Sequence, residues 1–237
     1  MEAEKLKKEL DSVGSPSDAK FLQRFFKTGK GEYGEDDVFI GIRMPVIRAH
    51  AKKYSDMELT EVEIVLHSPV HEHRMAACVI MVEKSKKLKR TPNEIKPIYD
   101  LYLGNVKKYI NNWDLVDISC RDVVGRYLAE RDRSMLYELA KSSNLWERRV
   151  SIISTWQFIR VSDLEDTWKI SKILLHDKED LIHKAVGWML REAGKRDEER
   201  LKEFLDDHAH EMPRTMLRYS LEKLHEQDKK HYMRMGK

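Results

Sequence analysis

The decapeptide Asn111–Cys120, with the sequence NNWDLVDISC, combines a large aromatic side chain and two carboxylates in one predicted helix. At 3.6 residues per turn, Trp113 and Asp117 lie on the same face, one above the other, while the aliphatic residues pack inward or sideways. Trp113 could equally be a core aromatic, and Asp117 a buried carboxylate with satisfied hydrogen bonds or a helix-capping residue. The choice between these interpretations depends on the rest of the chain.

Composition restricts the classes of protein that this chain can belong to. The 237 residues are 41% hydrophobic and 36% charged, which is enough apolar material for a core and argues against disorder. The net charge is +3, from 44 Lys and Arg against 41 Asp and Glu, so a nucleic-acid surface depends on where the cations lie.

Neither the cysteines nor the histidines have a spacing that indicates a metal or disulfide site. Cys78 and Cys120 lie in apolar helical runs without zinc-ligand spacing, and His71-Glu72-His73 lacks the spacing of a metalloprotease helix. The chain begins with a charged amphipathic helix and has no long apolar run. We therefore expect a soluble cytoplasmic protein that binds no membrane and uses neither a metal nor a cofactor.

Prolines mark the start of several predicted helices, and no segment has a convincing strand pattern. These prolines predict helices that begin near residues 16, 45, 69, 92 and 213. Because a proline inside a helix removes a backbone hydrogen bond, Pro97 predicts a late start or a kink in the helix that follows Thr91. Further helices with a 3.6-residue apolar period are predicted at 6–13, 59–67, 113–128, 134–140, 146–161, 164–175, 180–195 and 198–207.

A short motif, a basic residue followed by small or apolar residues near a helix start, recurs along the chain. It occurs at Arg74–Ala77, Arg149–Ile152, Lys184–Gly187 and Arg214–Leu217. The first step of 75 residues, against later steps of 35 and 30, leaves room for one more unit that begins near Asn112. The motif predicts one all-α domain over residues 1–230, an α-solenoid of HEAT-like antiparallel helix pairs, with a short basic tail at 231–237.

In such an array the equivalent helices line one surface, so the recurring basic residues predict a stripe of cations that follows DNA phosphates. The predicted contacts are Arg74, Arg148, Arg149, Lys184, Arg214 and Arg218, with Arg191 nearby. A solvated face that prevents aggregation explains any single arginine as well. The basic run at 84–90 is either a phosphate contact or positive charge that compensates a helix C-terminus.

Four segments together resemble the family of AlkD-like DNA alkylation repair glycosylases. They are Trp113–Asp117, Leu145–Val150, Ala185–Glu192 and Pro213–Tyr219, in the family's order, and the similarity runs over nearly the whole chain. The resemblance implies a right-handed superhelix of HEAT-like repeats that excises 3-methyladenine and 7-methylguanine from duplex DNA. It places the family's essential aspartate on Asp117 and its important arginine on Arg149. Its two site tryptophans fall on Trp113 and Trp188.

These residue types suit the implied chemistry. A purine alkylated at N3 or N7 is already cationic, so positive charge develops mainly on the sugar as the glycosidic bond stretches. Asp117 would stabilise this oxocarbenium-like cation and align a water for attack at the anomeric carbon. Trp113 and Trp188 would offer electron-rich faces to the cationic nucleotide, and Arg149 would hold a phosphate. Because an open repeat surface needs no pocket for the base, the resemblance implies recognition without base flipping.

Three features depart from the family pattern. Asn112 and Phe25 stand where some members have tryptophan and tyrosine, and the loop Gly29–Gly34 is longer and richer in glycine. These departures leave the catalytic carboxylate in place but put the range of lesions in question. Arg43 and Tyr33 are either DNA contacts or parts of a structural loop.

Two other functions remain open for an array of this kind. One is a non-enzymatic scaffold that binds proteins on its concave face, and the other is a DNA-binding relative without catalysis. Neither needs Asp117 together with the two tryptophans, and no lysine is clearly placed for lyase chemistry. We therefore expect a monomeric, monofunctional glycosylase that acts on double-stranded DNA containing alkylated purines.

Overall fold

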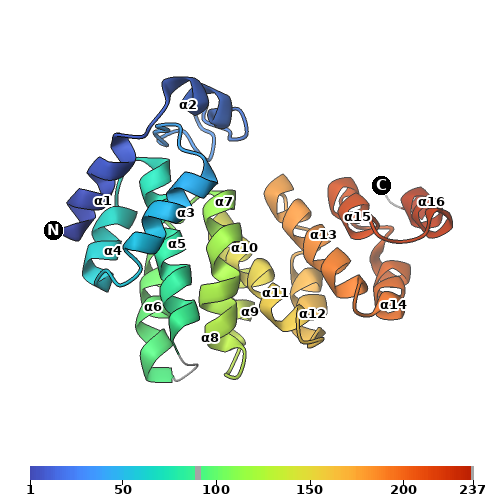
Figure 1. Ribbon diagram of the computed structural model, residues 1–237. Helices are drawn as coiled ribbons and strands as arrows, with labels where there is room; N and C mark the ends of the chain where they lie inside the picture. The colour runs from blue at the N-terminus through green and yellow to red at the C-terminus, as the bar shows by residue number, and fades with distance from the viewer. Residues whose placement is uncertain (89–91, 236–237) are drawn as a thin grey trace. The chain divides into compact units, whose positions relative to one another are not determined.

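The computed structural model describes residues 1–88 and 92–235, and the regular elements formed by these residues are helices (Figure 1). Within the described residues, the nearest approach to a strand is an isolated parallel bridge between Val38 and Val70. The predicted all-α fold class is therefore confirmed. None of the helices in the described part of the chain is long and apolar enough to cross a membrane.

Contacts divide the chain into two compact units, Met1–Val123 and Val124–Lys237. Unit 1 contains α1 (Glu2–Asp11), α2 (Pro16–Gln23), α3 (Met44–Lys53), α4 (Leu59–Leu66), α5 (His71–Lys87), α6 (Pro92–Asn105) and α7 (Trp113–Cys120). Unit 2 contains α8 (Arg126–Leu128), α9 (Ser134–Ala140), α10 (Leu145–Ser154), α11 (Trp156–Ile159), α12 (Glu165–Ile173), α13 (Asp180–Gly194), α14 (Glu198–His208), α15 (Arg214–Ser220) and α16 (Glu226–Met235). The π-helical segment η1 (Arg121–Gly125) follows α7, and the division falls within it.

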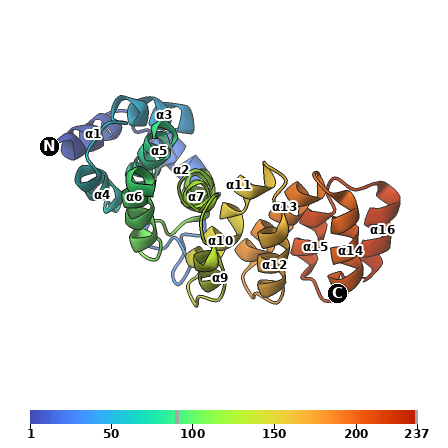
Figure 2. The ribbon, with the colours of Figure 1, turned by 90° about the horizontal axis from the view of Figure 1, so that it is seen from below.

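Helix α5 lies at the centre of unit 1, where it packs against α1, α3, α4, α6 and α7 (Figure 2). Its residues from His71 to Val82 are all buried, so it has no solvent-exposed face over its first three turns. The last eight of these residues are apolar, but the first four are His71, Glu72, His73 and Arg74. Four buried polar side chains in succession require partners from the surrounding segments.

In unit 2, α10 packs against α13, and α13 packs against α15, while α9, α12 and α14 pack against members of this row. Gly187 explains why α15 approaches α13 so closely. A Cβ at this position would lie 2.5 Å from the backbone oxygen of Met216, so a larger residue would push the two helices apart. Gly187, a small residue of the recurring motif, therefore serves helix packing.

The predicted repeat corresponds to real helices. The four copies of the motif lie at or near the starts of α5, α10, α13 and α15, and the unit expected near Asn112 is α7. The predicted 113–128 helix is formed as α7, η1 and α8 in succession, with a π-helical stretch in its middle. Single-domain organisation over 1–230 stays a prediction.

Several helix bounds differ from the predictions. Helix α1 begins at Glu2, and the helix predicted at 146–161 is interrupted at Thr155, which separates α10 from α11. Helix α6 begins at Pro92 and includes Pro97, so of the two outcomes predicted from Pro97 the late start is not observed. The kink, which would follow from the backbone hydrogen bond that Pro97 cannot form, stays a prediction.

The predicted C-terminal tail at 231–237 is helical as far as it is described, since α16 extends to Met235. This helix is strongly polar, and Tyr232 is its buried side chain, so its apolar period was too weak to be recognised in the sequence. Residues 236–237 lie outside the described residues, as do Lys89, Arg90 and Thr91.

Candidate functional site

The first two turns of α7 carry Trp113 and Asp117. Asn112 precedes it with an extended backbone, and its Oδ1 accepts a hydrogen bond of 2.8 Å from the backbone N–H of Trp113. Leu115 and Val116 are fully buried, whereas Trp113 and Asp117 are half-buried. The helix therefore holds an aromatic ring and a carboxylate one turn apart, both with access to solvent.

The ring of Trp113 is supported from one side by the loop that follows α2. Phe26 in this loop stacks on Trp113 with a centroid distance of 5.4 Å and an interplanar angle of 23°. Phe26 also contacts Phe39 and His71, at centroid distances of 4.9 Å and 5.1 Å. Such contacts fix the ring plane of Trp113 more firmly than aliphatic neighbours would. No sequence pattern predicted this role for Phe26.

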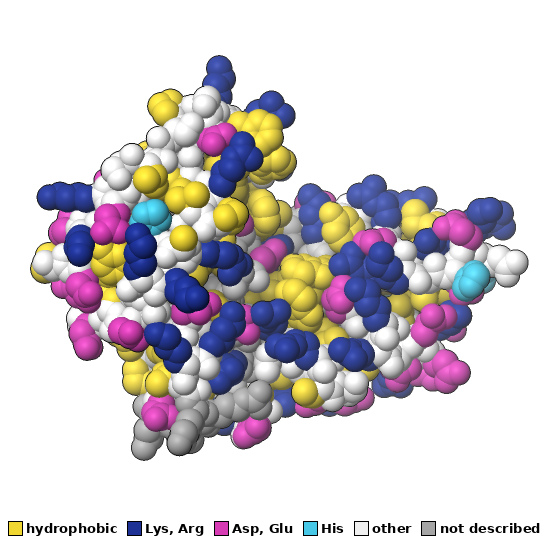
Figure 3. All heavy atoms as spheres, viewed as in Figure 1, with side chains coloured by type: hydrophobic (Ala, Val, Ile, Leu, Met, Phe, Trp, Pro, Cys, Tyr) yellow, Lys and Arg dark blue, Asp and Glu magenta, His cyan; other side chains and the backbone are white. Residues whose placement is uncertain are grey.

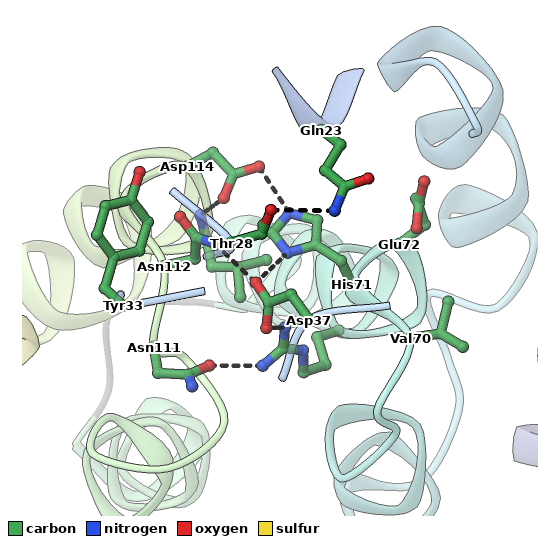
Figure 4. A network of polar contacts seen from close by, with 12 residues as sticks. Gln23, Thr28, Tyr33, Asp37, Val70, His71, Glu72, Asn111, Asn112 and Asp114 are labelled. Atoms are coloured by element: carbon green, nitrogen blue, oxygen red, sulfur yellow. Dashed lines mark hydrogen bonds and ion pairs between the residues drawn. The ribbon is translucent and has the colours of Figure 1, made fainter. Parts of the chain in front are cut away.

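The polar side chains of Asp37, His71 and Asp114 form a chain of contacts that was not predicted from the sequence (Figure 4). The two ring nitrogens of His71 face two different carboxylates. Nε2 lies 2.8 Å from Oδ2 of Asp114 in α7, and Nδ1 lies 3.3 Å from Oδ2 of Asp37 in the preceding loop. His71, at the start of α5, therefore bridges the loop and the first turn of α7.

Asp37 also accepts hydrogen bonds from Arg74 of α5 and from Asn112, which precedes α7. Its Oδ1 accepts a hydrogen bond from Nη2 of Arg74, and its Oδ2 accepts one of 2.8 Å from Nδ2 of Asn112. Arg74 also donates through Nη1 to Oδ1 of Asn111, at 2.5 Å. The two residues that precede α7 therefore bind neighbouring segments, Asn111 through Arg74 of α5 and Asn112 through Asp37 of the loop.

The electrostatics of this network favour a charged His71. Burial opposes protonation, but the charge and hydrogen bond of Asp114, with the hydrogen bond of Asp37, outweigh burial and raise the pKa of His71 to about 9. Burial also acts to raise the pKa of Asp37, yet His71, Arg74 and Asn112 together lower it. At neutral pH the network therefore pairs two carboxylates with two cations.

Arg74 is not the exposed phosphate contact that the repeat motif predicted. Its side chain is only 5% exposed and forms an ion pair with Asp37. A guanidinium that is enclosed by protein partners cannot reach a DNA phosphate and displace its counterion. The predicted phosphate contact is therefore corrected to a structural role for Arg74. The motif could not reveal this because Asp37, the partner, lies 37 residues earlier in the chain.

The two polar neighbours of His71 bind other segments. Glu72 accepts hydrogen bonds from the backbone N–H groups of residues 40, 41 and 42 at 2.7–3.3 Å, which holds the 38–42 loop on the start of α5. His73 contacts Ser68 Oγ at 2.9 Å and Asp11 Oδ1 of α1 at 3.0 Å. In the described residues no group of three or more His, Cys, Asp or Glu side chains is placed to hold a metal ion.

In unit 2, Arg148 and Arg149 both contact the segment at the start of α13. Arg148 lies in an ion pair with Asp177 at 2.6 Å and donates to the carbonyls of Ser142 and Ser143 at 3.0 Å. Arg149 is buried and donates through Nη1 to the carbonyl oxygen of Leu181. Arg148 and Arg149 were both predicted to contact DNA phosphates. In the structure both guanidinium groups are instead bound within the protein, Arg148 by Asp177 and backbone carbonyls and Arg149 by the carbonyl of Leu181.

Trp188 lies in α13, four residues after Lys184, and is half-buried. Its ring meets Trp156 of α11 edge to face, with centroids 5.0 Å apart and an interplanar angle of 62°. Trp156 therefore supports Trp188 much as Phe26 supports Trp113. Trp156 belongs to no copy of the recurring motif, so the motif did not predict this contact.

The remaining predicted DNA contacts have accessible side chains. Lys184 pairs with Asp180 at 2.7 Å, one turn earlier in α13, and Arg214 donates to the carbonyl of Met233 at 2.6 Å. Arg218 is exposed, with its guanidinium 6.0 Å from the centroid of the Tyr219 ring. In the view of Figure 3, basic side chains of unit 2 are interspersed with acidic ones and leave cations on the surface.

Arg43 and the glycine-rich loop belong to unit 1. Arg43 is 60% exposed and binds both carboxylate oxygens of Asp18 in α2, at 2.7 Å and 3.3 Å. The loop is closed by its own hydrogen bonds, from Gly29 to Glu32, from Gly31 to Glu35 and from Lys27 to the hydroxyl of Tyr33. Tyr33 thus has a structural contact within the loop.

The basic run at 84–90 is partly described. Lys87 pairs with Asp56 at 2.9 Å and donates to Ser55, and Lys86 lies 3.6 Å from Glu83. These contacts hold the C-terminal turn of α5. The contribution predicted for Lys89 and Arg90 lies outside the described residues.

Comparison with known proteins decides the family. The sequence model of the DNA alkylation repair enzyme family matches residues 6–224. The chain belongs to this family. Among solved structures, it is similar to one described as a predicted DNA alkylation repair enzyme from Enterococcus faecalis, with a TM-score of 0.70 and 18% sequence identity over 90% of this chain and 97% of the other. At that identity the likeness shows the fold. No curated protein matches.

Membership of the DNA alkylation repair family directs attention to Trp113 and Asp117 of α7, which are both half-buried. Within unit 1 the structure brings Trp113 and Asp117 together on one helix face, and within unit 2 it places Arg149 and Trp188 on adjacent helices, α10 and α13. A DNA alkylation repair protein acts on DNA, so exposed cations and half-buried aromatic rings are the groups expected at its surface.

Proposed function

We propose that the protein is a monofunctional DNA glycosylase that hydrolyses the N-glycosidic bond of cationic alkylated purines, such as 3-methyladenine and 7-methylguanine, in duplex DNA. The observation that supports this most directly is Asp117. It is a half-buried carboxylate, one turn after the half-buried Trp113, on a helix whose first turn is anchored by buried polar contacts. Preorganised negative charge of this kind stabilises a developing cation.

In the proposed reaction, the bond between the sugar C1′ and the purine nitrogen breaks, and its electron pair leaves with the base. The base was cationic, so it departs neutral and needs no general acid. Asp117 stabilises the positive charge that remains on the sugar and accepts a hydrogen bond from a water. The water oxygen bonds to C1′ and its proton passes to the carboxylate and then to solvent, which leaves an abasic site.

The two tryptophans are proposed to contact the damaged nucleotide through their faces. A cationic sugar or base over the face of an indole is attracted by the ring quadrupole. Trp113 is stacked on Phe26 on one side, and Trp188 is held edge to face by Trp156. Because cation–π and carboxylate contacts act on charge and not on the edges of the base, we propose that the base is recognised without being flipped out.

Phosphate contacts are assigned in this proposal to the accessible cations Lys184, Arg214, Arg218 and Arg43. Arg148 and Arg149 are proposed to act through the start of α13, whose backbone and neighbouring loop they bind. A guanidinium that fixes a helix start can order a DNA-facing helix without touching DNA. In this proposal Arg149 orders the start of α13 and does not itself hold a phosphate.

The test is a single-turnover assay that measures release of free 7-methylguanine from methylated duplex DNA by purified protein. Asp117→Asn keeps the size of the side chain and removes its charge, so the rate should fall on the order of 10²- to 10³-fold, with little change in duplex affinity. Asp100→Asn, at an exposed carboxylate of α6 paired with Lys96, is the matched control and should excise at the wild-type rate.

Each alternative function has its own outcome in this assay. Duplex binding without base release by the wild-type protein indicates a DNA-binding relative that lacks catalysis. Neither binding nor release indicates a protein-binding scaffold. Equal rates for wild type and Asp117→Asn contradict the role of the carboxylate even if the protein is a glycosylase.

A further inference from the structure

His71 has an unusual hydrogen-bonding requirement. Both of its ring nitrogens face carboxylate oxygens, Nε2 that of Asp114 and Nδ1 that of Asp37 (Figure 4). Ionised carboxylates only accept hydrogen bonds, and a neutral imidazole has a single N–H. Both contacts are therefore satisfied at once only when the ring carries two protons and a positive charge.

The charge balance of the buried network leads to the same protonation state. The side chains of His71 and Asp37 are each 4% exposed, and Asp114 is the more open partner. With Arg74 as the second cation, the charged groups that face one another are Asp37 from the loop, Asp114 from α7, and His71 and Arg74 from α5. A neutral His71 would leave one uncompensated negative charge in this enclosed space, which is unfavourable.

Three segments that are distant in the sequence meet at this ring. The loop contributes Asp37, and it also contributes Phe26, which stacks on Trp113. Helix α7 contributes Asp114, the residue between Trp113 and the turn that carries Asp117. Since α5 is enclosed by other helices of unit 1, it provides the fixed base to which the loop and α7 are attached.

We propose that His71 is a positioning residue of the glycosylase: as an imidazolium bound between Asp37 and Asp114, it sets the orientation of the first α7 turn and of Trp113 and Asp117. This inference rests on the proposed function. His71 does not touch the reacting atoms and acts through α7. A carboxylate displaced by about 1 Å can lose on the order of 10²-fold in rate, so a positioning contact one turn away has a measurable effect.

If His71 positions α7, the excision rate should fall at alkaline pH because His71 loses its proton. Because the pKa of His71 is raised to about 9, the imidazolium persists at neutral pH and loses its proton as the pH rises through that value. The bridge between Asp37 and Asp114 then lacks one hydrogen bond and one positive charge. The excision rate should fall in the same pH range while the protein stays folded.

The experiment compares His71→Gln with His73→Gln. Glutamine keeps a hydrogen-bond donor but cannot carry charge. His73 is the matched control because it lies in the same turn of α5 and is also buried, yet it binds Ser68 and Asp11 and none of the α7 residues. In single-turnover excision of 7-methylguanine, His71→Gln should be about 10- to 100-fold slower and His73→Gln within about 2-fold of wild type, with unchanged duplex affinity.

Two further readouts separate positioning from simple stabilisation. Hydrogen exchange of the 111–120 segment should accelerate in His71→Gln and not in His73→Gln. After subtraction of spontaneous release, the wild-type rate should fall as the pH rises through about 9, and this fall should be absent in His71→Gln. Wild-type excision by folded His71→Gln, or faster exchange spread evenly over unit 1, would overturn the proposal.

Two outcomes need a second variant or measurement: a His71→Gln protein that does not fold, and a wild-type protein that releases no base. If His71→Gln does not fold, the variant His71→Gln/Asp114→Asn removes one charge of each sign, and the same rate and exchange outcomes apply to it. If the wild-type protein releases no methylated base, the proposed function fails. Hydrogen exchange of the 111–120 segment, followed at pH values on either side of 9, then decides by itself whether His71 holds α7.

Discussion

Arg74 and Arg214 occupy equivalent positions in the recurring motif, but their surroundings are opposite. Arg74, in α5, is enclosed and forms an ion pair with Asp37 and a hydrogen bond with Asn111. Arg214, at the start of α15, is exposed and donates to one backbone carbonyl of α16. The difference arises because a loop covers the start of α5 and contributes a carboxylate there.

This comparison shows that a repeat motif determines where a cation lies on its helix but not what the cation does. The same residue type anchors a helix start at Arg74 and remains available to a ligand at Arg214. Buried cations are expected to affect stability, and exposed cations are expected to affect binding to polyanions. Three measurements test this distinction.

The largest difference should appear in stability. Arg74→Met leaves Asp37 buried with fewer partners, so the free energy of unfolding should fall by about 3 kcal/mol. Arg214→Met alters an exposed side chain and should change it by less than about 0.5 kcal/mol. Urea unfolding at neutral pH measures both. Similar losses for the two variants would show that burial of Arg74 has no energetic consequence.

The second measurement uses two histidines of α5 whose pKa values shift in opposite directions. The pKa of His71 is raised from 6.5 to about 9, so its contribution to stability is complete below pH 6.5 and is lost as the pH rises through 9. That contribution is on the order of 3 kcal/mol. Burial lowers the pKa of His73 despite the opposing effect of Asp11, so its contribution is present above 6.5 and is lost as the pH falls.

Unfolding free energies measured from pH 5 to 10 test this pair. His71→Gln should remove the alkaline loss of stability, and His73→Gln should reduce the acid loss. Asp37, whose pKa is lowered, remains ionised over this whole range and adds no slope. If the stability of His71→Gln still falls at alkaline pH, a group other than His71 causes that loss.

The smallest effect concerns the salt dependence of duplex binding, and it rests on the proposed function. If Lys184, Arg214, Arg218 and Arg43 contact phosphates, the slope of log affinity against log salt should be about −3.6, and each single alanine substitution should flatten it by about one unit. Arg74→Met should leave the slope unchanged. A flatter slope in Arg74→Met would return this buried arginine to the DNA contacts.

The sequence predicted the helical parts of this protein well and their polar interior poorly. The periodic segments at 134–140, 164–175, 180–195 and 198–207 correspond closely to α9, α12, α13 and α14. Helix α16 was missed because it is mostly polar, with a single buried side chain, Tyr232. Patterns of apolar residues detect helices that bury a face, and they fail for helices with little apolar surface.

The all-α class, the repeated helix starts, the family resemblance and the placement of Trp113 and Asp117 on one helix face could all be predicted from the amino-acid sequence. Each of these depends on residues within a few positions of one another or on a repeated pattern. The burial of Arg74, the contacts of His71 with Asp37 and Asp114, and the stacking of Phe26 on Trp113 became visible in the folded structure. The partners of these side chains lie 34–87 residues apart in the chain, and the charge and burial of a side chain depend on the groups that folding brings to it.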